Sequence, residues 1–492
     1  MTGRQLHLGY MYWANGTHPA GWRYPGAEHA RAFDADYIVE LARIAEAAKF
    51  DFFFFGDRLA TGVEYEFTNT SVIARIEPFT TAAYLATLTS RIGLVVTANP
   101  TYSEPFNLAR LTASLDHISH GRASWNIVTG ADGRAADNYS RDEHGDANTR
   151  YDRADEFVAV VRALWDSWED DAFIRDKESG AFVDGTKVHR LDHDGTAFQV
   201  RGPLNVARPP QGHPVILHAG TSDRSRDLGA RDADVLFAAA ATIEQGLAYR
   251  GDIRRRALGF GRNPDDLAVL PGLTPIVAET TERARRIYDE LNALITLDDD
   301  LRFGGREPEH WAPADTIGRR EDYGPGLRNL GALSQRLGYD ATGHDLDHAV
   351  PAHAVDAFTP VGRQLAGAVE RRTGRTVGGE HPATWRDLLY AHIVTGPLVV
   401  GSAAEVADYI EEWFRAGASD GFNIQSAFLV EQLHAFVDLV VPELQRRGLF
   451  RSDYSGTTLR DHLGLDRPAN PWATAAADPT ETPDTAAIAA GA

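Results

Sequence analysis

The 492-residue sequence contains no cysteine. Disulfide bonds, thiolate nucleophiles and cysteine-ligated zinc or iron–sulfur clusters are therefore excluded. The sequence also lacks any apolar run near the roughly 18 residues that a membrane-spanning helix needs. Its first residues, MTGRQLHLGYMYWANG, lack the basic and apolar regions of a secretory signal. We therefore expect a cytoplasmic protein with no membrane partner.

Positive charge is scarce, because 49 Lys and Arg residues stand against 70 Asp and Glu residues, for a formal net charge of −21. Proteins that bind nucleic acid generally gather Lys and Arg on one surface, which releases counterions from the phosphates. The charge therefore predicts no nucleic-acid partner. The hydrophobic fraction of 43% is ordinary for a globular protein and allows a large core.

Several catalytic motifs are missing as well. There is no G-x-S-x-G nucleophile elbow and no Walker A loop, so hydrolase and NTPase interpretations lose their usual support. His189 and His193 are four residues apart, as are His344 and His348, and each pair could share a helix face. Neither pair belongs to an H-E-x-x-H motif, so we predict no metal site.

Short apolar runs alternate with amphipathic segments along most of the chain. The run FFFF at 52–55 is typical of a strand buried on both faces, and residues 36–50 have apolar residues at helical spacing. About eight such units can be counted, which fits either a closed barrel or an open doubly wound sheet. The count favours an α/β fold of the (β/α)8 TIM-barrel type, spanning 1–298 and 392–450.

Two segments depart from this alternation. Residues 299–391 are rich in Gly, Pro, Arg and Asp and are expected to form an inserted lobe or lid. Residues 451–492 form a C-terminal extension whose Pro-, Ala- and Thr-rich end is predicted to be disordered. Between them, Ser402 and Glu405 predict a capping box, and Gly417 lies near the end of the same helix.

Polar residues follow the predicted strands, at the end where a TIM barrel places its active site. Asp57 could hydrogen-bond a ligand or hold a turn, and the sequence leaves both open. Thr97 and Asn126 could offer neutral hydrogen bonds to a heterocycle or satisfy loop backbone. Such groups suit a flavin ring, whose edge alternates donors and acceptors.

Two expected helix starts have residues that are compatible with a phosphate. Ser222 follows the run VILHAG and precedes a helical segment whose free N–H groups would attract an anion, and Gly220 would let the backbone approach it closely. The alternative is that Ser222 only caps the helix, which is the commoner use of serine there. Arg150 and Tyr151 could hold a phosphate at the other start, or could simply pack and face solvent.

Longer segments carry a resemblance to a known family. The segments YIVELARIAEAAKFDFFFFGDRLA, RYDRADEFVAVVRALWDSWEDDA and PVILHAGTSDRSRD, with the region 91–130, resemble the bacterial luciferase-like superfamily of flavin-dependent monooxygenases. Within it they are similar to the nitrilotriacetate and dibenzothiophene-sulfone monooxygenase branch. The resemblance covers most of residues 5–470.

This resemblance implies a barrel with insertions that binds reduced FMN (FMNH2), supplied by a separate NAD(P)H-dependent flavin reductase. Such relatives react O2 through a C4a-peroxyflavin to oxygenate or cleave small organic substrates, from aminopolycarboxylates and organosulfur compounds to alkanes and heterocycles. It also implies a homodimer or tetramer. At matching positions, Asp57 and Thr97 would lie by the isoalloxazine ring, and Tyr151 and Ser222 near the phosphate.

The sequence departs from the family at one place. The family has a His four residues before the Tyr, where this chain has Ala147, so that flavin contact is missing or is moved to His144. His18 matches a loop near the flavin face and is the candidate acid–base or peroxide-stabilising residue, with packing beside Trp22 and Pro19 as the alternative.

Other functions stay open at this point. A deazaflavin-dependent hydride-transfer oxidoreductase and a non-catalytic flavin-binding protein fit the same resemblance. The aromatic run YMYW at residues 10–13 favours a planar or apolar ligand over a polycarboxylate.

Overall fold

We describe the fold from a computed structural model of the chain. The structure describes residues 4–60, 71, 74–130, 133–140, 143–295, 327–394 and 396–475.

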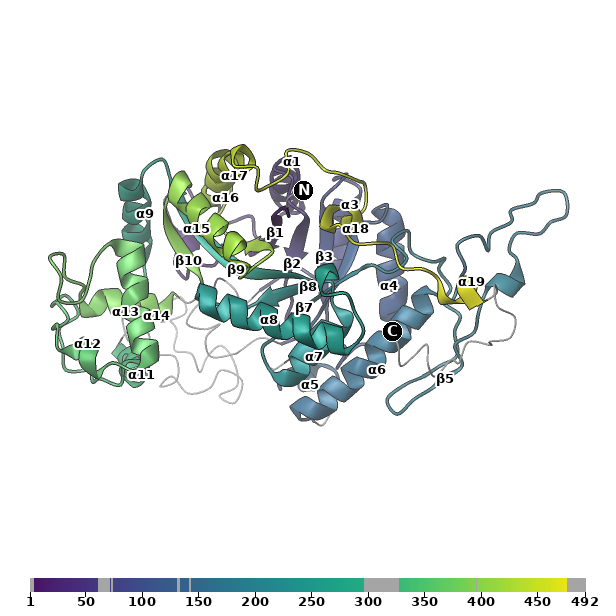
Figure 1. The fold of residues 1–492 in the computed structure, drawn as a ribbon, viewed down its shortest axis with the longest axis horizontal. Coiled ribbons are helices and arrows are strands. Elements are labelled where there is room, and N and C mark those ends of the chain that lie inside the picture. Colours follow the sequence, from purple (N-terminus) through teal and green to yellow (C-terminus); the bar gives the residue numbers. More distant parts are fainter. Residues whose placement is uncertain are drawn as a thin grey trace.

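Eight parallel strands form a closed barrel at the centre of the molecule (Figure 1). Each strand pairs with the next around the ring, and the circle closes where β8 pairs with β9 and β11 pairs with β1. The strands are β1 (His7–Tyr12), β2 (Phe52–Phe55), β3 (Gly93–Ala98), β4 (Ala123–Ile127), β7 (Val215–Ala219), β8 (Val235–Ala238), β9 (Ala268–Ala278) and β11 (Gly421–Ile424). The predicted (β/α)8 TIM barrel is confirmed.

One further strand joins the sheet outside this ring. β10 (Leu398–Ser402) pairs with the second half of β9, from Thr274 to Ala278, beyond the part of β9 that closes the barrel. This strand was not predicted from the sequence, because its five residues run directly into the capping box of the next helix.

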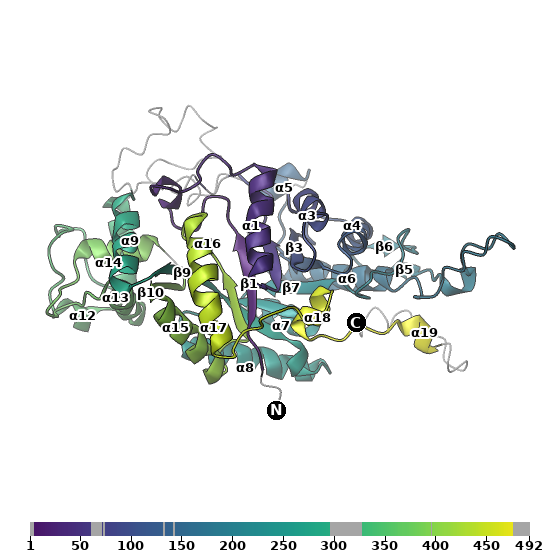
Figure 2. The same cartoon turned by 90° about the horizontal axis from the view of Figure 1, so that it is seen from above.

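Helices cover the outside of the barrel, as Figure 2 shows from above. They are α1 (Ala35–Ala47), α3 (Pro78–Ala86), α4 (Pro105–Ile118), α6 (Ala147–Trp165), α7 (Asp223–Asp232), α8 (Ile243–Gly259), α15 (Ala403–Ala416), α16 (Glu431–Ala435) and α17 (Val441–Arg446). The predicted capping box of Ser402 and Glu405 begins α15, and Gly417 ends it in a left-handed conformation, so both predictions are confirmed. α6 begins at Ala147, slightly ahead of the helix start expected beside Arg150 and Tyr151, because Asp146 caps it.

The interior of the barrel is filled by apolar side chains from the inward positions of the strands. Phe52, Phe54 and Leu217 belong to this cluster. It is completed by Leu459 and Leu463 of α18 (Leu459–Leu463), a short helix in the C-terminal extension. Gly93 leaves room for this contact, since a Cβ there would lie 2.7 Å from Leu459 Cδ1 and 3.0 Å from the Asp51 carbonyl oxygen. The C-terminal extension is therefore part of the barrel core.

A helical lobe stands at one side of the barrel (Figure 1, left). It consists of α11 (Leu327–Leu337), α12 (Ala354–Ala357), α13 (Pro360–Thr373) and α14 (Trp385–Ile393), which share a core of their own. Arg375 joins the lobe to Asp289 of α9 (Thr281–Ala293) at 2.9 Å. The first part of the predicted insertion 299–391 and the predicted disordered end lie outside the described residues, so the domain limits stay a prediction.

A second excursion leaves the barrel on the opposite side, between α6 and β7 (Figures 1 and 2). It contains the two-stranded hairpin of β5 (His193–Asp194) and β6 (Gln199–Val200). The C-terminal helix α19 (Pro471–Ala475) lies against it, where Trp472 stacks on His189 with ring centroids 4.2 Å apart. Within the described parts of the chain, no helix is both long and apolar enough to cross a membrane.

Candidate active site

Thr97 and Asn126 form a hydrogen-bonded pair near the carboxyl ends of adjacent strands β3 and β4. The Thr97 hydroxyl donates to the Phe55 carbonyl at 2.8 Å, and the Asn126 amide nitrogen donates to the Thr97 hydroxyl at 3.0 Å. Trp125 and Ile127 belong to the outer hydrophobic core, so the alternation of the strand turns Asn126 inward. The Asn126 carbonyl oxygen is buried and accepts no hydrogen bond from the described residues. This oxygen is therefore a ready acceptor at the mouth of the barrel.

Asp57 follows β2 next to this pair and is partly buried. Burial is the largest influence on its carboxyl and raises its pKa, and the charge of Glu77 acts in the same direction. The backbone N–H of Arg58 and the charge of Arg75 oppose this shift. A negative charge on Asp57 is therefore less stable than on a surface aspartate.

Ser222 lies at the amino end of α7 on the neighbouring strand-to-helix connection. Its hydroxyl accepts from the Ser225 N–H at 3.3 Å, so the capping interpretation is confirmed. The phosphate role stays a prediction, and it is compatible with the cap because other N–H groups of the first turn have no intrahelical partner. Gly220 is required here, since a Cβ would lie 1.9 Å from the Ser225 hydroxyl oxygen.

Tyr151 is brought close to the start of α7 by Arg224. The Arg224 guanidinium donates to Asp152 at 2.7 Å and to Asp155 at 3.0 Å, and it lies 5.9 Å from the centre of the Tyr151 ring. Its hydrogen bond to Asp152 is the largest influence that raises the pKa of Arg224. Because two carboxylates already surround it, Arg224 serves to join α6 to α7 beside Tyr151.

His144 lies just before α6, three residues ahead of Ala147. Its Nδ1 is hydrogen-bonded to the Tyr102 hydroxyl at 2.5 Å, and the two rings stack with centroids 5.9 Å apart. Tyr102 also stacks on Tyr139 at 4.9 Å. The structure thus places His144 in an aromatic cluster at the same helix entrance as Tyr151, and its role as a flavin contact stays a prediction.

His18 has a different environment. Its side chain is 1% exposed, and its Nδ1 accepts from the Ala20 N–H at 3.1 Å. The proton therefore lies on Nε2, which donates to the Asn292 side-chain oxygen of α9 at 3.2 Å. Burial lowers the pKa of His18 to about 4. With both ring nitrogens engaged inside the protein, this geometry favours the packing interpretation, and the acid–base role stays a prediction.

Asn423 of β11 is a buried polar residue that was not among the predicted site residues. It is 1% exposed, and both polar atoms of its amide lack a partner among the described residues. Its neighbours in register are Gly9 and Gly272, so it lies between two positions without side chains. The one sequence signal that could have identified Asn423 is that it is a polar residue inside the apolar strand segment GFNI. Among the described residues, no group of three or more His, Asp and Glu is arranged to hold a metal ion.

Comparison with known proteins identifies the family. A family model described as luciferase-like monooxygenase matches residues 13–420. N-acetyl-S-(2-succino)cysteine monooxygenase from Bacillus subtilis is 40% identical, over 96% of this chain and 99% of its own. Nitrilotriacetate monooxygenase component A from Aminobacter aminovorans is 40% identical, over 95% and 98%.

A solved structure supports the same relationship. The crystal structure of riboflavin lyase with modified FMN and riboflavin has a TM-score of 0.72 at 29% identity, covering 94% of this chain and 97% of its own. The resemblance to the nitrilotriacetate and dibenzothiophene-sulfone monooxygenase branch is confirmed. The chain therefore belongs to the luciferase-like monooxygenase family, and it is a monooxygenase.

Proposed function

We propose that this protein is the oxygenase component of a two-component system, which uses FMNH2 and O2 to oxygenate or cleave a small organic substrate. The observation that carries the proposal is the unpartnered Asn126 carbonyl oxygen, held at the strand ends by Thr97, on the strand next to the Gly220–Ser222 turn. A polar edge and an anion-compatible helix start therefore lie at the ends of two adjacent strands, β4 and β7.

The ring end of this site fits a flavin. The Asn126 oxygen accepts, and the Thr97 hydroxyl already donates to Phe55 and accepts from Asn126, which fixes the amide orientation. A flavin edge carries an N–H donor that suits the free oxygen. Asp57, with its raised pKa, is the third polar group expected at the ring.

The phosphate end of this site also fits. The first turn of α7 supplies free N–H groups and the positive end of its dipole, and Ser222 and Tyr151 add hydroxyl groups. Gly220 has no side chain, so the turn can pack closely against Ser225. His144 contributes from the aromatic cluster beside α6.

In this proposal the protein binds the flavin, orients it and shields it from water. Reduced FMN, when bound, supplies the electrons that activate O2. The packed aromatic and aliphatic interior of the barrel would exclude water from the lower side of the site when the flavin is bound.

The name of nitrilotriacetate monooxygenase component A marks that relative as one part of a larger system. We extend this to the present chain and propose a separate NAD(P)H:flavin reductase as its partner. We further propose that the chain assembles as a homodimer or tetramer.

Oxygen consumption tests this function directly. The purified protein is mixed with FMN, NADH and a flavin reductase, candidate substrates are added, and products are analysed by mass spectrometry with 18O2. Substrate-dependent incorporation of 18O supports the proposal. Hydride transfer with a reduced deazaflavin and no O2 use, or tight binding of oxidised flavin with no turnover, would contradict it.

A further inference from the structure

His218 is a buried histidine on β7 that packs against α7. Its side chain is 1% exposed. The preceding residue, Leu217, faces the barrel interior, so the alternation of the strand turns His218 outward, towards the helices. α7 comes close to the ring at Gly229, where a Cβ would lie 3.3 Å from His218 Cδ2. The imidazole is therefore enclosed between the strand and the helix.

Both ring nitrogens of His218 have partners, and these partners set its tautomer. Nδ1 lies 2.9 Å from the Ile127 carbonyl oxygen, which can only accept, so Nδ1 carries the proton. Burial is the largest influence on the ring and lowers its pKa, so the imidazole is neutral at pH 7. Nε2 is then an acceptor, and the Ser225 hydroxyl donates to it at 2.8 Å. His218 therefore joins the end of β4 to the first turn of α7.

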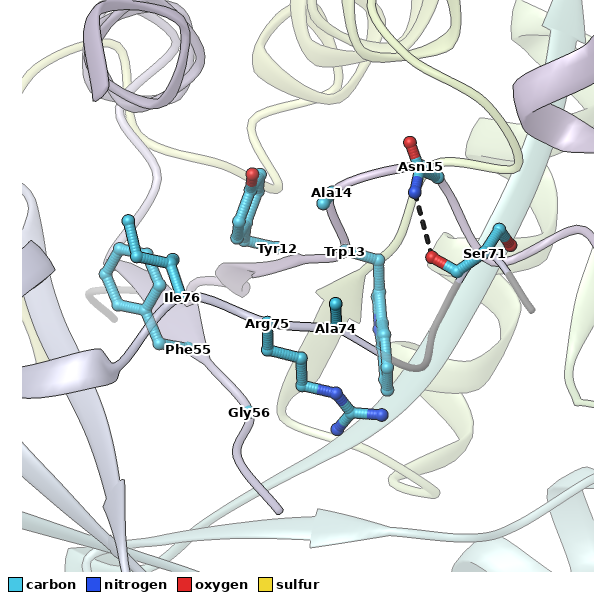
Figure 3. A pocket seen from close by; sticks show the side chains of 10 residues that line it. All are labelled: Tyr12, Trp13, Ala14, Asn15, Phe55, Gly56, Ser71, Ala74, Arg75 and Ile76. Atoms are coloured by element: carbon cyan, nitrogen blue, oxygen red, sulfur yellow. Dashed lines mark hydrogen bonds between the residues drawn. The ribbon is translucent and has the colours of Figure 1, made fainter. Parts of the chain in front are cut away.

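The β4 end of this link is also held from its other side. Asn126, the residue before Ile127, donates to the Thr97 hydroxyl at 3.0 Å. That hydroxyl donates in turn to the carbonyl of Phe55, the last residue of β2. Figure 3 shows the Phe55 side chain, which lines a small cavity together with Tyr12. A row of hydrogen-bonded residues therefore runs from β2 across β3, β4 and β7 to α7.

The α7 end of the link lies directly beside the Gly220–Ser222 turn. A Cβ on Gly220 would lie 1.9 Å from the Ser225 hydroxyl oxygen and 3.8 Å from His218 Nε2. The turn therefore packs on the hydrogen bond between these two side chains. The Ser225 N–H donates to the Ser222 hydroxyl at 3.3 Å. Ser225 thus bonds His218 through its side chain and Ser222 through its backbone.

A second contact fixes the same turn from α8. The Tyr249 hydroxyl donates to the Gly220 carbonyl at 3.2 Å, and the Tyr249 side chain is buried. In a planar trans peptide, the carbonyl and the following N–H point in opposite directions. The Thr221 N–H therefore points away from Tyr249, and it has no acceptor among the described residues. This N–H is available to a ligand at the start of α7.

The place of the α7 start relative to β4 matters for a ligand that contacts both. The proposed site holds a flavin ring at Asn126 and its phosphate at Ser222, and the chain between ring and phosphate has a limited length. Binding groups must be held to within about 0.5 Å by the residues behind them. A displaced α7 would therefore weaken the phosphate contacts and leave the ring contacts in place.

We infer that His218 is a positioning residue for the phosphate end of the flavin site, and that it acts through Ser225. It holds the first turn of α7 at a fixed place relative to the end of β4. The inference rests on the proposed function. A histidine that only filled the space between β7 and α7 would contribute to stability, but not to the choice between a phosphorylated and an unphosphorylated flavin.

Anaerobic calorimetric titration of the full-length protein measures this choice, with FMNH2 and with reduced riboflavin, which lacks the phosphate. His218→Asn places an amide nitrogen near the position of Nδ1, so it keeps the donor to Ile127 and loses the acceptor for Ser225. We expect the dissociation constant for FMNH2 to rise about tenfold, and that for reduced riboflavin to change by less than about twofold.

Three further variants show whether His218 acts through Ser225. Ser225→Ala removes the hydroxyl and keeps the backbone N–H, and it should cause the same loss. The double variant His218→Asn, Ser225→Ala should lose no more than either single variant, because each removes the same hydrogen bond. His218→Gln extends an amide oxygen as far as Nε2, so it should bind FMNH2 within about threefold of wild type. Additive losses in the double variant, or equal losses in His218→Gln and His218→Asn, would overturn the inference.

His462→Asn is the matched control for the loss of a buried imidazole. His462 is 4% exposed and lies on α18, where its Nε2 donates to the Arg91 carbonyl at 2.8 Å. This change should lower the stability of the protein and leave the ratio of the two dissociation constants unchanged. If His462→Asn changes that ratio as much as His218→Asn does, the effect is a general loss of packing and the inference is wrong.

Failure of the proposed function and failure of this inference give different results. If wild type binds neither reduced flavin, or binds both equally, the proposed phosphate site is wrong and the role of His218 falls with it. If wild type prefers FMNH2, and both His218→Asn and Ser225→Ala keep that preference in full, this inference alone is wrong.

Discussion

The Asn126 amide nitrogen lies 3.0 Å from the Thr97 hydroxyl oxygen, and this bond points the other amide atom, a buried carbonyl oxygen, away from any protein donor that the structure describes. An unsatisfied buried oxygen costs about 1–3 kcal/mol of folding stability. A ligand that donates to it recovers that free energy, so we expect this pair to contribute to flavin affinity.

Thr97→Val tests this pair, because it removes the hydroxyl that orients Asn126 and keeps the side-chain shape. We expect the dissociation constant for FMN to rise about tenfold, equivalent to the loss of one hydrogen bond. Fluorescence titration of the flavin measures it. Thr112→Val is the control, since Thr112 is equally buried but bonds only within α4 and to Trp165. The same change in affinity for both variants would contradict the assignment.

Two substitutions of Ser222 separate its helix-capping role from its proposed phosphate-binding role. Ser222→Ala should destabilise the protein by about 1 kcal/mol through loss of the α7 cap. Ser222→Asp preserves a cap but places a negative charge where the phosphate is expected. It should therefore weaken FMN at least tenfold while riboflavin, which has no phosphate, binds nearly as before.

The control for Ser222→Asp is Thr242→Asp at the cap of α8, whose hydroxyl accepts from the Gln245 N–H at 3.3 Å. That substitution should leave the affinity for both flavins unchanged. If Ser222→Asp weakens FMN and riboflavin equally, the phosphate assignment is wrong and the residue is only a helix cap.

His18 makes stability depend on pH. Its pKa is about 4 in the folded protein and about 6.5 when unfolded, so the unfolded chain binds more protons between these values. Neutral His18 therefore contributes its full stabilisation above pH 6.5. The free energy of unfolding falls by about 3 kcal/mol as the pH is lowered to 4.

His18→Gln removes this titration. Urea unfolding of both proteins at pH 4.5 and pH 7 should show a smaller fall in stability for the variant than for the wild type. An equal fall would mean that His18 titrates normally. The pH profiles of kcat/KM for the wild type and His18→Gln should have the same shape near pH 6.5. An inflection there that is present in the wild type and absent from His18→Gln would support the acid–base role.

The C-terminal extension should be essential for stability. Leu459 of α18 is fully buried inside the barrel, so Leu459→Ala is expected to lower the free energy of unfolding by about 2–5 kcal/mol. Leu258→Ala, at a side chain that is 63% exposed, should change it little. Thermal unfolding that leaves both variants equally stable would show that α18 does not hold the barrel together.

Much of the barrel was predictable because local patterns determine it. The run at Phe52–Phe55 and the capping box at Ser402 and Glu405 fold as their neighbours in sequence dictate. β10 was missed because its pairing with β9 joins segments more than 100 residues apart, and nothing in its five residues signals a partner.

The position of the candidate residues at the strand ends was predictable, but their contacts were not. Thr97 and Asn126 were found because they end strands, yet their mutual hydrogen bond depends on the register of β3 against β4. His18 looked available for proton transfer in the sequence, but its partner Asn292 comes from a helix 274 residues away. Long-range packing of this kind has no local signature.

Anaerobic calorimetric titration of the full-length protein with FMNH2 measures whether the strand ends bind reduced FMN. We predict a saturating heat of binding at one flavin per chain, which weakens in both Thr97→Val and Ser222→Asp. The absence of any heat of binding, or the same affinity in all three proteins, would contradict it.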